Sequence, residues 1–225
     1  MPETAAGSST FPSADAEAAR YALLRRLAPS MRHHLVVNLQ PIGMIYEVME
    51  RRLRAPTPDL AHVQESASKI NGFAKAALAS CLDVVSWLAP DDSVPIGVDD
   101  AVRECTSLLA TSLSFRGYAL RNNVTPLEGT VRRSAIRSLL SATLVHCSDH
   151  VRPPAEIELS CGSEGGIACI AVQVRPGQGG QVFATEPNYR KIAWGDLEAL
   201  AAADGVDLRR AGERIELRLP WLAAR

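Results

Sequence analysis

The chain lacks a strong net charge, a long apolar run and a paired-cysteine motif. Its 225 residues carry 24 Lys and Arg against 25 Asp and Glu, so no basic field would attract nucleic acid or an anionic membrane. No apolar stretch approaches the roughly 20 residues that span a bilayer. The first 15 residues lack the charged start and apolar centre of a signal peptide. We therefore expect a cytoplasmic protein with neither nucleic acid nor membrane as a partner.

Motifs for metal binding and nucleophilic catalysis are also missing. The five cysteines are Cys81, Cys105, Cys147, Cys161 and Cys169. No two of them form a C-x-x-C pair, and His62, His146 and His150 have no carboxylate or cysteine partners at metal-ligand spacing. Residues 177–180 lack the Lys and Ser/Thr of a P-loop, and no nucleophile elbow is present. We expect no metal site, and we interpret the cysteines as small buried hydrophobic residues.

The first half of the chain has a helical repeat of apolar residues. From about residue 16 to residue 54 these are Leu24, Leu27, Met31, Leu35, Leu39, Ile42, Ile45, Met49 and Leu53. The spacing predicts one long helix, with Pro29 as a kink or boundary and Pro41 as a bend. A second helix, to about residue 88, has its own apolar side. Its members are Leu60, Val63, Ala67, Ile70, Ala74, Leu78, Cys81, Val85 and Leu88.

The two helices form a long hairpin whose apolar seam is too exposed for the hairpin to be stable alone. Dimerisation into a four-helix bundle is the simplest solution, so we expect a homodimer. After a turn-rich linker, the pattern predicts helices at 98–115, 130–150 and 194–203, and strands at 118–123, 156–160, 167–174, 206–209 and 214–219. The fold class is therefore α+β, with a disordered tail at 1–15, the hairpin at 16–89 and an α/β sandwich at 96–225.

The first helix resembles the phosphoryl-accepting helix of sensor histidine kinases, which commonly reads Leu-Ala-x-x-Met-Ser-His-Glu-Leu-Arg-x-Pro-Leu-x-x-Ile. The matching residues are Leu27, Ala28, Met31, His33, Leu35, Leu39 and Ile42. Residues 95–98 resemble the opening of the ATPase-like domain of that family, and residues 215–220 its closing strand. The resemblance covers roughly residues 23–220, and it implies that His33 is the phosphoryl acceptor.

Several positions depart from the kinase pattern. His34 stands where kinases carry an acidic general base, and Val37 where many carry a Thr or Asn used in dephosphorylation. His146 replaces the Asn expected to hold Mg²⁺, a hard cation that prefers oxygen ligands. Arg175 replaces the Asp that reads adenine, and a guanidinium cannot accept a hydrogen bond. Residues 181–191 contain no Gly for a phosphate-binding lid. These departures predict that the chain binds no ATP and no other cofactor.

The first hypothesis is a histidine phosphotransferase of a two-component phosphorelay, similar to the phosphotransferases that kept a kinase-like fold. It would pass a phosphoryl group between His33 and the receiver-domain Asp of a response regulator or a hybrid histidine kinase. A neutral imidazole is a suitable nucleophile for this transfer. His34 is the weaker candidate for the acceptor because it lies closer to the apolar seam.

The receiver would contact exposed residues around His33. Our candidates are Arg32, Val36, Val37 and Gln40. Arg32 could offset phosphate charge. The alternative hypothesis is a non-catalytic pseudokinase scaffold that binds a response regulator or a kinase without carrying phosphate. A third is an active histidine kinase with an atypical motif.

Overall fold

The computed structural model describes residues 12–177 and 189–222. Two compact units are present: Leu27–Asp91 is one, and Met1–Arg26 together with Asp92–Arg225 is the other. This division differs from the expected boundary near residue 16, because the start of the first helix belongs to the C-terminal unit. Most of the tail expected at residues 1–15 lies outside the described residues.

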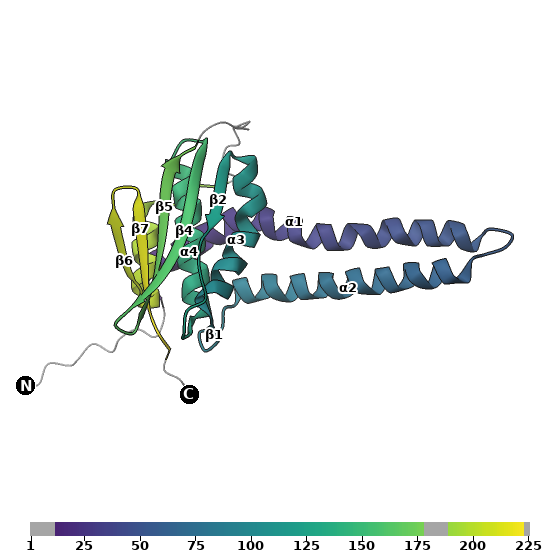
Figure 1. The fold of residues 1–225 in the computed structure, drawn as a ribbon, viewed down its shortest axis with the longest axis horizontal. Helices are drawn as coiled ribbons and strands as arrows, with labels where there is room; N and C mark the ends of the chain where they lie inside the picture. Colours follow the sequence, from purple (N-terminus) through teal and green to yellow (C-terminus); the bar gives the residue numbers. More distant parts are fainter. Residues whose placement is uncertain (1–11, 178–188, 223–225) are drawn as a thin grey trace, which may run out of the picture. The chain divides into compact units, whose positions relative to one another are not determined.

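The first unit is the helical hairpin predicted from the sequence. Helix α1 (Ala14–Leu53) enters it at Leu27, and α2 (Leu60–Leu88) runs back antiparallel to α1 (Figure 1). Asp59 caps α2 by accepting hydrogen bonds from the backbone N–H of Ala61 at 3.0 Å and His62 at 3.3 Å. None of the described helices combines the length and apolar character needed to cross a membrane.

Helix α1 is continuous through both of its prolines, Pro29 and Pro41. Proline has no backbone N–H, so each one removes a helical hydrogen bond, at a cost of about 3 kcal/mol relative to alanine in a helix interior. Neither proline is therefore a helix boundary, and tertiary contacts must offset this local cost.

The second unit contains a five-stranded mixed sheet in the order β2-β4-β5-β7-β6. The strands are β2 (Tyr118–Asn122), β4 (Ala155–Glu164), β5 (Ile167–Pro176), β6 (Asp207–Ala211) and β7 (Arg214–Pro220). Only β2 and β4 pair in parallel. A smaller sheet pairs β1 (Pro95–Ile96) with β3 (Val131–Arg132). The helix expected from residue 130 begins at Arg133 because residues 131 and 132 are used in this pairing.

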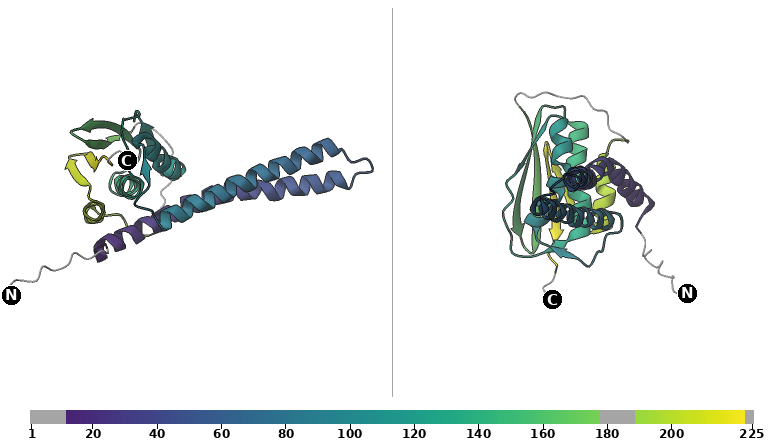
Figure 2. Two further views of the ribbon diagram at one scale, coloured as in Figure 1. Left: turned by 90° about the horizontal axis from the view of Figure 1, so that it is seen from below. Right: turned by 90° about the vertical axis from the view of Figure 1, so that its right-hand side faces the viewer.

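Helices α3 (Val98–Phe115), α4 (Arg133–His150) and α5 (Trp194–Asp204) cover one face of the large sheet (Figures 1 and 2). Every α4 side chain from Leu139 to Asp149 is buried. The first part of α1, up to Arg26, lies on these helices on the side away from the sheet (Figure 2, left), and its Ala16, Ala19 and Ala22 are fully buried. The expected α+β class with a long helical hairpin is confirmed. The dimeric bundle stays a prediction.

The cysteines follow the expected burial only in part. Cys105 and Cys147 are buried, whereas Cys81 is exposed and Cys161 and Cys169 are half-buried. Cys81 is exposed because it lies on a side of α2 that α1 does not cover. Among the described residues, no group of three or more His, Cys, Asp or Glu side chains could hold a metal ion.

Candidate functional site

His33 lies on α1 and its side chain is exposed, whereas the neighbouring His34 is half-buried. The centroids of their rings are 6.4 Å apart. Below them, Asn38 Nδ2 donates to the His34 carbonyl at 3.2 Å and to Ser80 Oγ of α2 at 3.0 Å. The bond to Ser80 ties α1 to α2 one turn away from the histidines. Of the two imidazoles, His33 is the one that a partner protein can reach.

The burial pattern divides the hairpin into a covered stripe and two outer faces. The covered stripe includes His34, Asn38 and Ile45 on α1, and Ala77 and Val84 on α2. In an antiparallel pair of right-handed helices, residues one position after the covered ones share one face of the pair. Residues one position before them share the opposite face. His33 immediately precedes His34, which places it on the second of these faces.

The residues that follow the covered stripe form what we term the apolar face. Its apolar members are Leu39, Tyr46, Ala67, Ala74, Leu78, Val85 and Leu88, and the polar Gln64 and Asn71 of α2 share it. Leu39 is 50% exposed and Leu78 61% exposed. A contiguous exposed apolar surface on a hairpin is typical of a protein–protein interface.

The residues that precede the covered stripe form what we term the histidine face. Its members are His33, Val37, Gln40, Met44 and Val48 from α1, and Glu65, Lys69, Gly72, Ala76, Ala79 and Asp83 from α2. On this face α1 offers exposed apolar side chains, whereas α2 offers small and charged ones. The two outer faces therefore differ in character, and the candidate acceptor lies on the less apolar one.

The four residues predicted to bind a partner are all exposed, but they do not lie together. Val37 and Gln40 lie on the histidine face, one and two turns beyond His33. Val36 lies on the side of α1 away from α2. Arg32 follows the buried Met31 and so lies toward the apolar face. The role of these residues in partner binding stays a prediction.

His146, at the position expected to hold Mg²⁺, is buried. Its Nδ1 donates to the Ile192 carbonyl at 2.7 Å, and its ring centroid lies 4.2 Å from that of His150. Burial lowers the pKa of His146, and the nearby charges of His150 and Arg210 lower it further, against the opposing effect of the Ile192 hydrogen bond. The imidazole is therefore neutral near pH 7 and already engaged by the chain.

A buried ion pair lies three residues farther along α4. The Asp149 carboxylate accepts hydrogen bonds from Nη1 and Nη2 of Arg26, both at 2.6 Å, and from the Ile192 backbone N–H at 3.0 Å. Nη2 of Arg116 lies 3.3 Å from Oδ1 of the same carboxylate. Burial by itself would raise the pKa of Asp149, but the hydrogen bonds from Arg26 and Ile192 and the two guanidinium charges outweigh it and lower the pKa. Asp149 is thus an ionised residue inside a satisfied network.

Two further contacts hold the start of α1. Arg20 Nη2 lies 2.7 Å from Asp204 Oδ1 at the end of α5. The rings of Tyr21 and Tyr189 meet edge to face with centroids 6.0 Å apart. Burial raises the pKa of Asp204, and the charges of Arg20 and Arg132 only partly oppose that rise. The segment from Ala14 to Arg26 is therefore held by charged contacts at its middle, through Arg20, and at its C-terminal end, through Arg26.

The turn expected to read adenine is only partly described. Gly177 lies where a Cβ would be 3.1 Å from the backbone of Pro154 and Ala155, and its N–H donates to the Pro154 carbonyl at 2.9 Å. The close approach of these two backbone segments explains why a glycine occupies position 177. Residues 178–188, which include most of the expected lid, lie outside the described residues.

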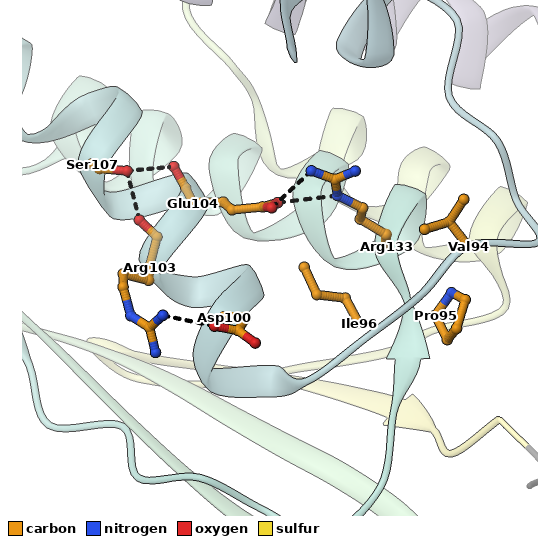
Figure 3. A pocket seen from close by; sticks show the side chains of 8 residues that line it. All are labelled: Val94, Pro95, Ile96, Asp100, Arg103, Glu104, Ser107 and Arg133. Atoms are coloured by element: carbon orange, nitrogen blue, oxygen red, sulfur yellow. Dashed lines mark hydrogen bonds and ion pairs between the residues drawn. The ribbon is translucent and has the colours of Figure 1, made fainter. Parts of the chain in front are cut away.

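A pocket of about 530 Å³ lies beside α3 and β1 (Figure 3). Its lining residues are Val94, Pro95, Ile96, Asp100, Arg103, Glu104, Ser107 and Arg133. Glu104 accepts from Arg133 at 2.7 Å, and Arg103 donates to Asp100 at 2.6 Å. The charges in this pocket pair with one another, which leaves no unmatched charge to recognise a ligand.

Sequence patterns did not point to Arg26 or Asp149. The two residues are 123 positions apart, and each occupies an ordinary position in a helix. The only local signal is an Asp near the C-terminal end of α4, where a carboxylate is unfavourable for the helix dipole and therefore needs a partner.

Comparison with known proteins gave similarities in structure alone. No protein-family model and no curated protein matched the chain. The histidine kinase AdeS of Acinetobacter baumannii is similar at 11% identity and a TM-score of 0.45, over 81% of this chain and 98% of that one. A histidine kinase from Burkholderia phymatum STM815 has 13% identity and a TM-score of 0.43, over 94% and 100% of the two chains. A bacterial phosphotransferase has 14% identity and a TM-score of 0.40, over 93% and 98%.

Proposed function

We propose that this protein is a histidine phosphotransferase of a two-component phosphorelay, which exchanges a phosphoryl group between His33 and the aspartate of a receiver domain without binding ATP. The observation that carries the proposal is a contrast between two histidines. His33, at the acceptor position of the motif, is exposed, whereas His146, at the expected Mg²⁺ position, is buried and bonded to Ile192.

The transfer is a single exchange of bonds at phosphorus. A ring nitrogen of His33 forms the N–P bond while the P–O bond to the receiver aspartate breaks and leaves a carboxylate. The proton of the attacking imidazole passes to solvent, and the reverse reaction returns the phosphoryl group to an aspartate. The chain needs no acidic residue after His33 for this reaction, because the receiver brings the acidic pocket that the resemblance to phosphorelays implies. His34 in that position is compatible with a carrier and unsuited to an ATP-dependent kinase.

Loss of ATP binding is supported by how the chain fills its own ATPase-like unit. The neutral ring of His146 donates to Ile192, and Asp149 accepts from the N–H of the same residue. These two bonds hold the segment before α5 against α4, where the resemblance implies that Mg²⁺ and phosphates would bind. A nucleotide there would have to break both bonds and find no oxygen ligand at position 146.

The two outer faces of the hairpin suit two different partners. We assign the apolar face to a second copy of the chain, which would bury Leu39, Leu78 and Val85 in a four-helix bundle. We assign the histidine face to the receiver, because a protein that approaches His33 must cover Val37 and Met44 on the same face. Val37 is 51% exposed and Met44 63% exposed, so each has apolar surface to contribute to such a contact.

Labelled phosphoryl transfer to the wild-type protein from two donors tests the proposal. One donor is Mg²⁺-ATP and the other is a panel of phosphorylated receiver domains from the same organism. Labelling from a receiver but not from ATP is the expected result. Labelling from ATP would show an active kinase instead. A receiver that binds but transfers no label would establish the scaffold function.

A further inference from the structure

The ion pair between Arg26 and Asp149 has a relation to His33 that the transfer chemistry does not explain. Arg26 and His33 are seven residues apart on one continuous helix, so they lie two turns apart on nearly the same side of α1. Arg26 is 9% exposed and Asp149 7% exposed. The segment that precedes the acceptor is therefore held by a buried and bidentate contact.

Pro29 stands between these two residues. Its ring nitrogen carries no hydrogen, so the helix has one bond fewer at the point where the segment ending at Arg26 continues toward His33. Such a position is where a helix kinks or opens first. A contact that immobilises the turn before Pro29 compensates for this weakness.

Several contacts show that Arg26 is more than a surface charge. Beyond its two bonds to Asp149, Nη1 donates to the Arg190 carbonyl at 3.1 Å. Asp149 is itself oriented by the Ile192 N–H and by Arg116, so the carboxylate has little freedom to follow a moving helix. Because guanidinium and carboxylate are joined through two parallel bonds, the pair fixes the rotation of the helix as well as its position.

We propose that Arg26 and Asp149 are positioning residues for His33: their ion pair keeps α1 helical across Pro29 and so presents the acceptor imidazole in one orientation to the receiver. The proposal rests on the proposed function of His33. It gives the ATPase-like unit a role that needs no nucleotide, which is to hold the start of the phosphoryl-accepting helix.

The test uses the full chain with Arg26→Gln, Pro29→Ala and the double variant. The control is Arg54→Gln, because Arg54 is exposed and lies just beyond the C-terminal end of α1. We expect Arg26→Gln to slow transfer at saturating receiver by about tenfold or more, since small misplacements of reacting groups are costly. The receiver concentration at half-saturation should stay the same. Pro29→Ala restores the missing N–H, and the double variant should recover most of the rate.

Two results would overturn the proposal. One is a transfer rate in Arg26→Gln equal to that of wild type. The other is a loss of rate in Arg26→Gln that the added Pro29→Ala substitution does not repair, because a purely structural role predicts no repair at this position. Hydrogen exchange of the amides between residues 27 and 33 gives a second readout that needs no receiver. It should rise in Arg26→Gln and return in the double variant, and unchanged exchange in Arg26→Gln would contradict the proposal. If wild type itself accepted no phosphoryl group, the function of His33 would fail while this exchange readout still tested the ion pair.

Discussion

Arg26 and Asp149 are separated by 123 residues, yet the guanidinium donates to both carboxylate oxygens at 2.6 Å. Their side chains are 4% and 0% exposed. Removing one member of a buried ion pair leaves the other charged and without compensation. This relationship makes the start of α1 part of the same compact unit as Asp92–Arg225, and it has a direct consequence for stability.

Asp149→Ala should lower the free energy of unfolding by about 3–5 kcal/mol, the range found when one partner of a buried pair is removed. The matched control is Glu50→Ala, which breaks the exposed pair with Arg54 and should change stability by about 0.5 kcal/mol or less. Urea denaturation followed by circular dichroism measures both. Equal effects of the two substitutions would contradict the buried network.

The pKa of His146 predicts a dependence of stability on pH. Because burial lowers this pKa in the folded protein, the unfolded chain takes up the proton first as the pH falls below about 6.5. The stabilisation by neutral His146 is therefore complete above that pH and is lost as the pH falls through the lower folded value. His146→Gln can keep a donor for Ile192 without titrating. Its unfolding free energy should fall less than that of wild type between about pH 7.5 and 5, and parallel profiles would argue against this interpretation.

Self-association should depend on the apolar face. Leu78→Glu places a charge among exposed apolar residues, whereas Ala79→Glu places the same charge one position away on the histidine face. We expect Leu78→Glu to shift the mass in sedimentation equilibrium from dimer to monomer, and Ala79→Glu to leave it dimeric. A monomeric wild type, or a dimeric Leu78→Glu protein, would exclude this face as the interface.

Receiver binding should depend on the histidine face. Val37→Glu lies one turn beyond His33 and should weaken binding of the cognate receiver by about tenfold or more, as expected for a central contact residue. Arg52→Glu lies about 28 Å from His33 along α1 and serves as the control, with unchanged affinity. Calorimetric titration measures both. Affinity that survives Val37→Glu would move the docking surface elsewhere.

The fold could be predicted where local patterns decide it. Helix α3 runs from Val98 to Phe115 as expected, since its apolar spacing is bounded by Gly97 and Gly117. The start of α4 was wrong because Val131 pairs with Ile96, 35 residues earlier, and no local pattern records that pairing. Long-range contacts of this kind override a helical pattern.

The candidate site was likewise predictable only where local patterns decide it. The motif around His33 singled out one exposed histidine, and helical spacing alone then places Val37 beside it. The apolar side predicted for α2, which includes Leu78 and Val85, is mostly the exposed one, because α1 covers the neighbouring stripe through Ala77 and Val84. Two apolar stripes on one helix look alike in the sequence, and only packing decides which of them is covered. Arg26 and Asp149 could not be paired from the sequence, since nothing local distinguishes them.

The identity of the acceptor is tested most directly by two adjacent substitutions, His33→Gln and His34→Gln, in transfer from a phosphorylated receiver. His33 is exposed and His34 half-buried, so label should be lost in His33→Gln and kept in His34→Gln. Label that persists in His33→Gln, or that disappears only in His34→Gln, would contradict the assignment of His33 as the phosphoryl carrier.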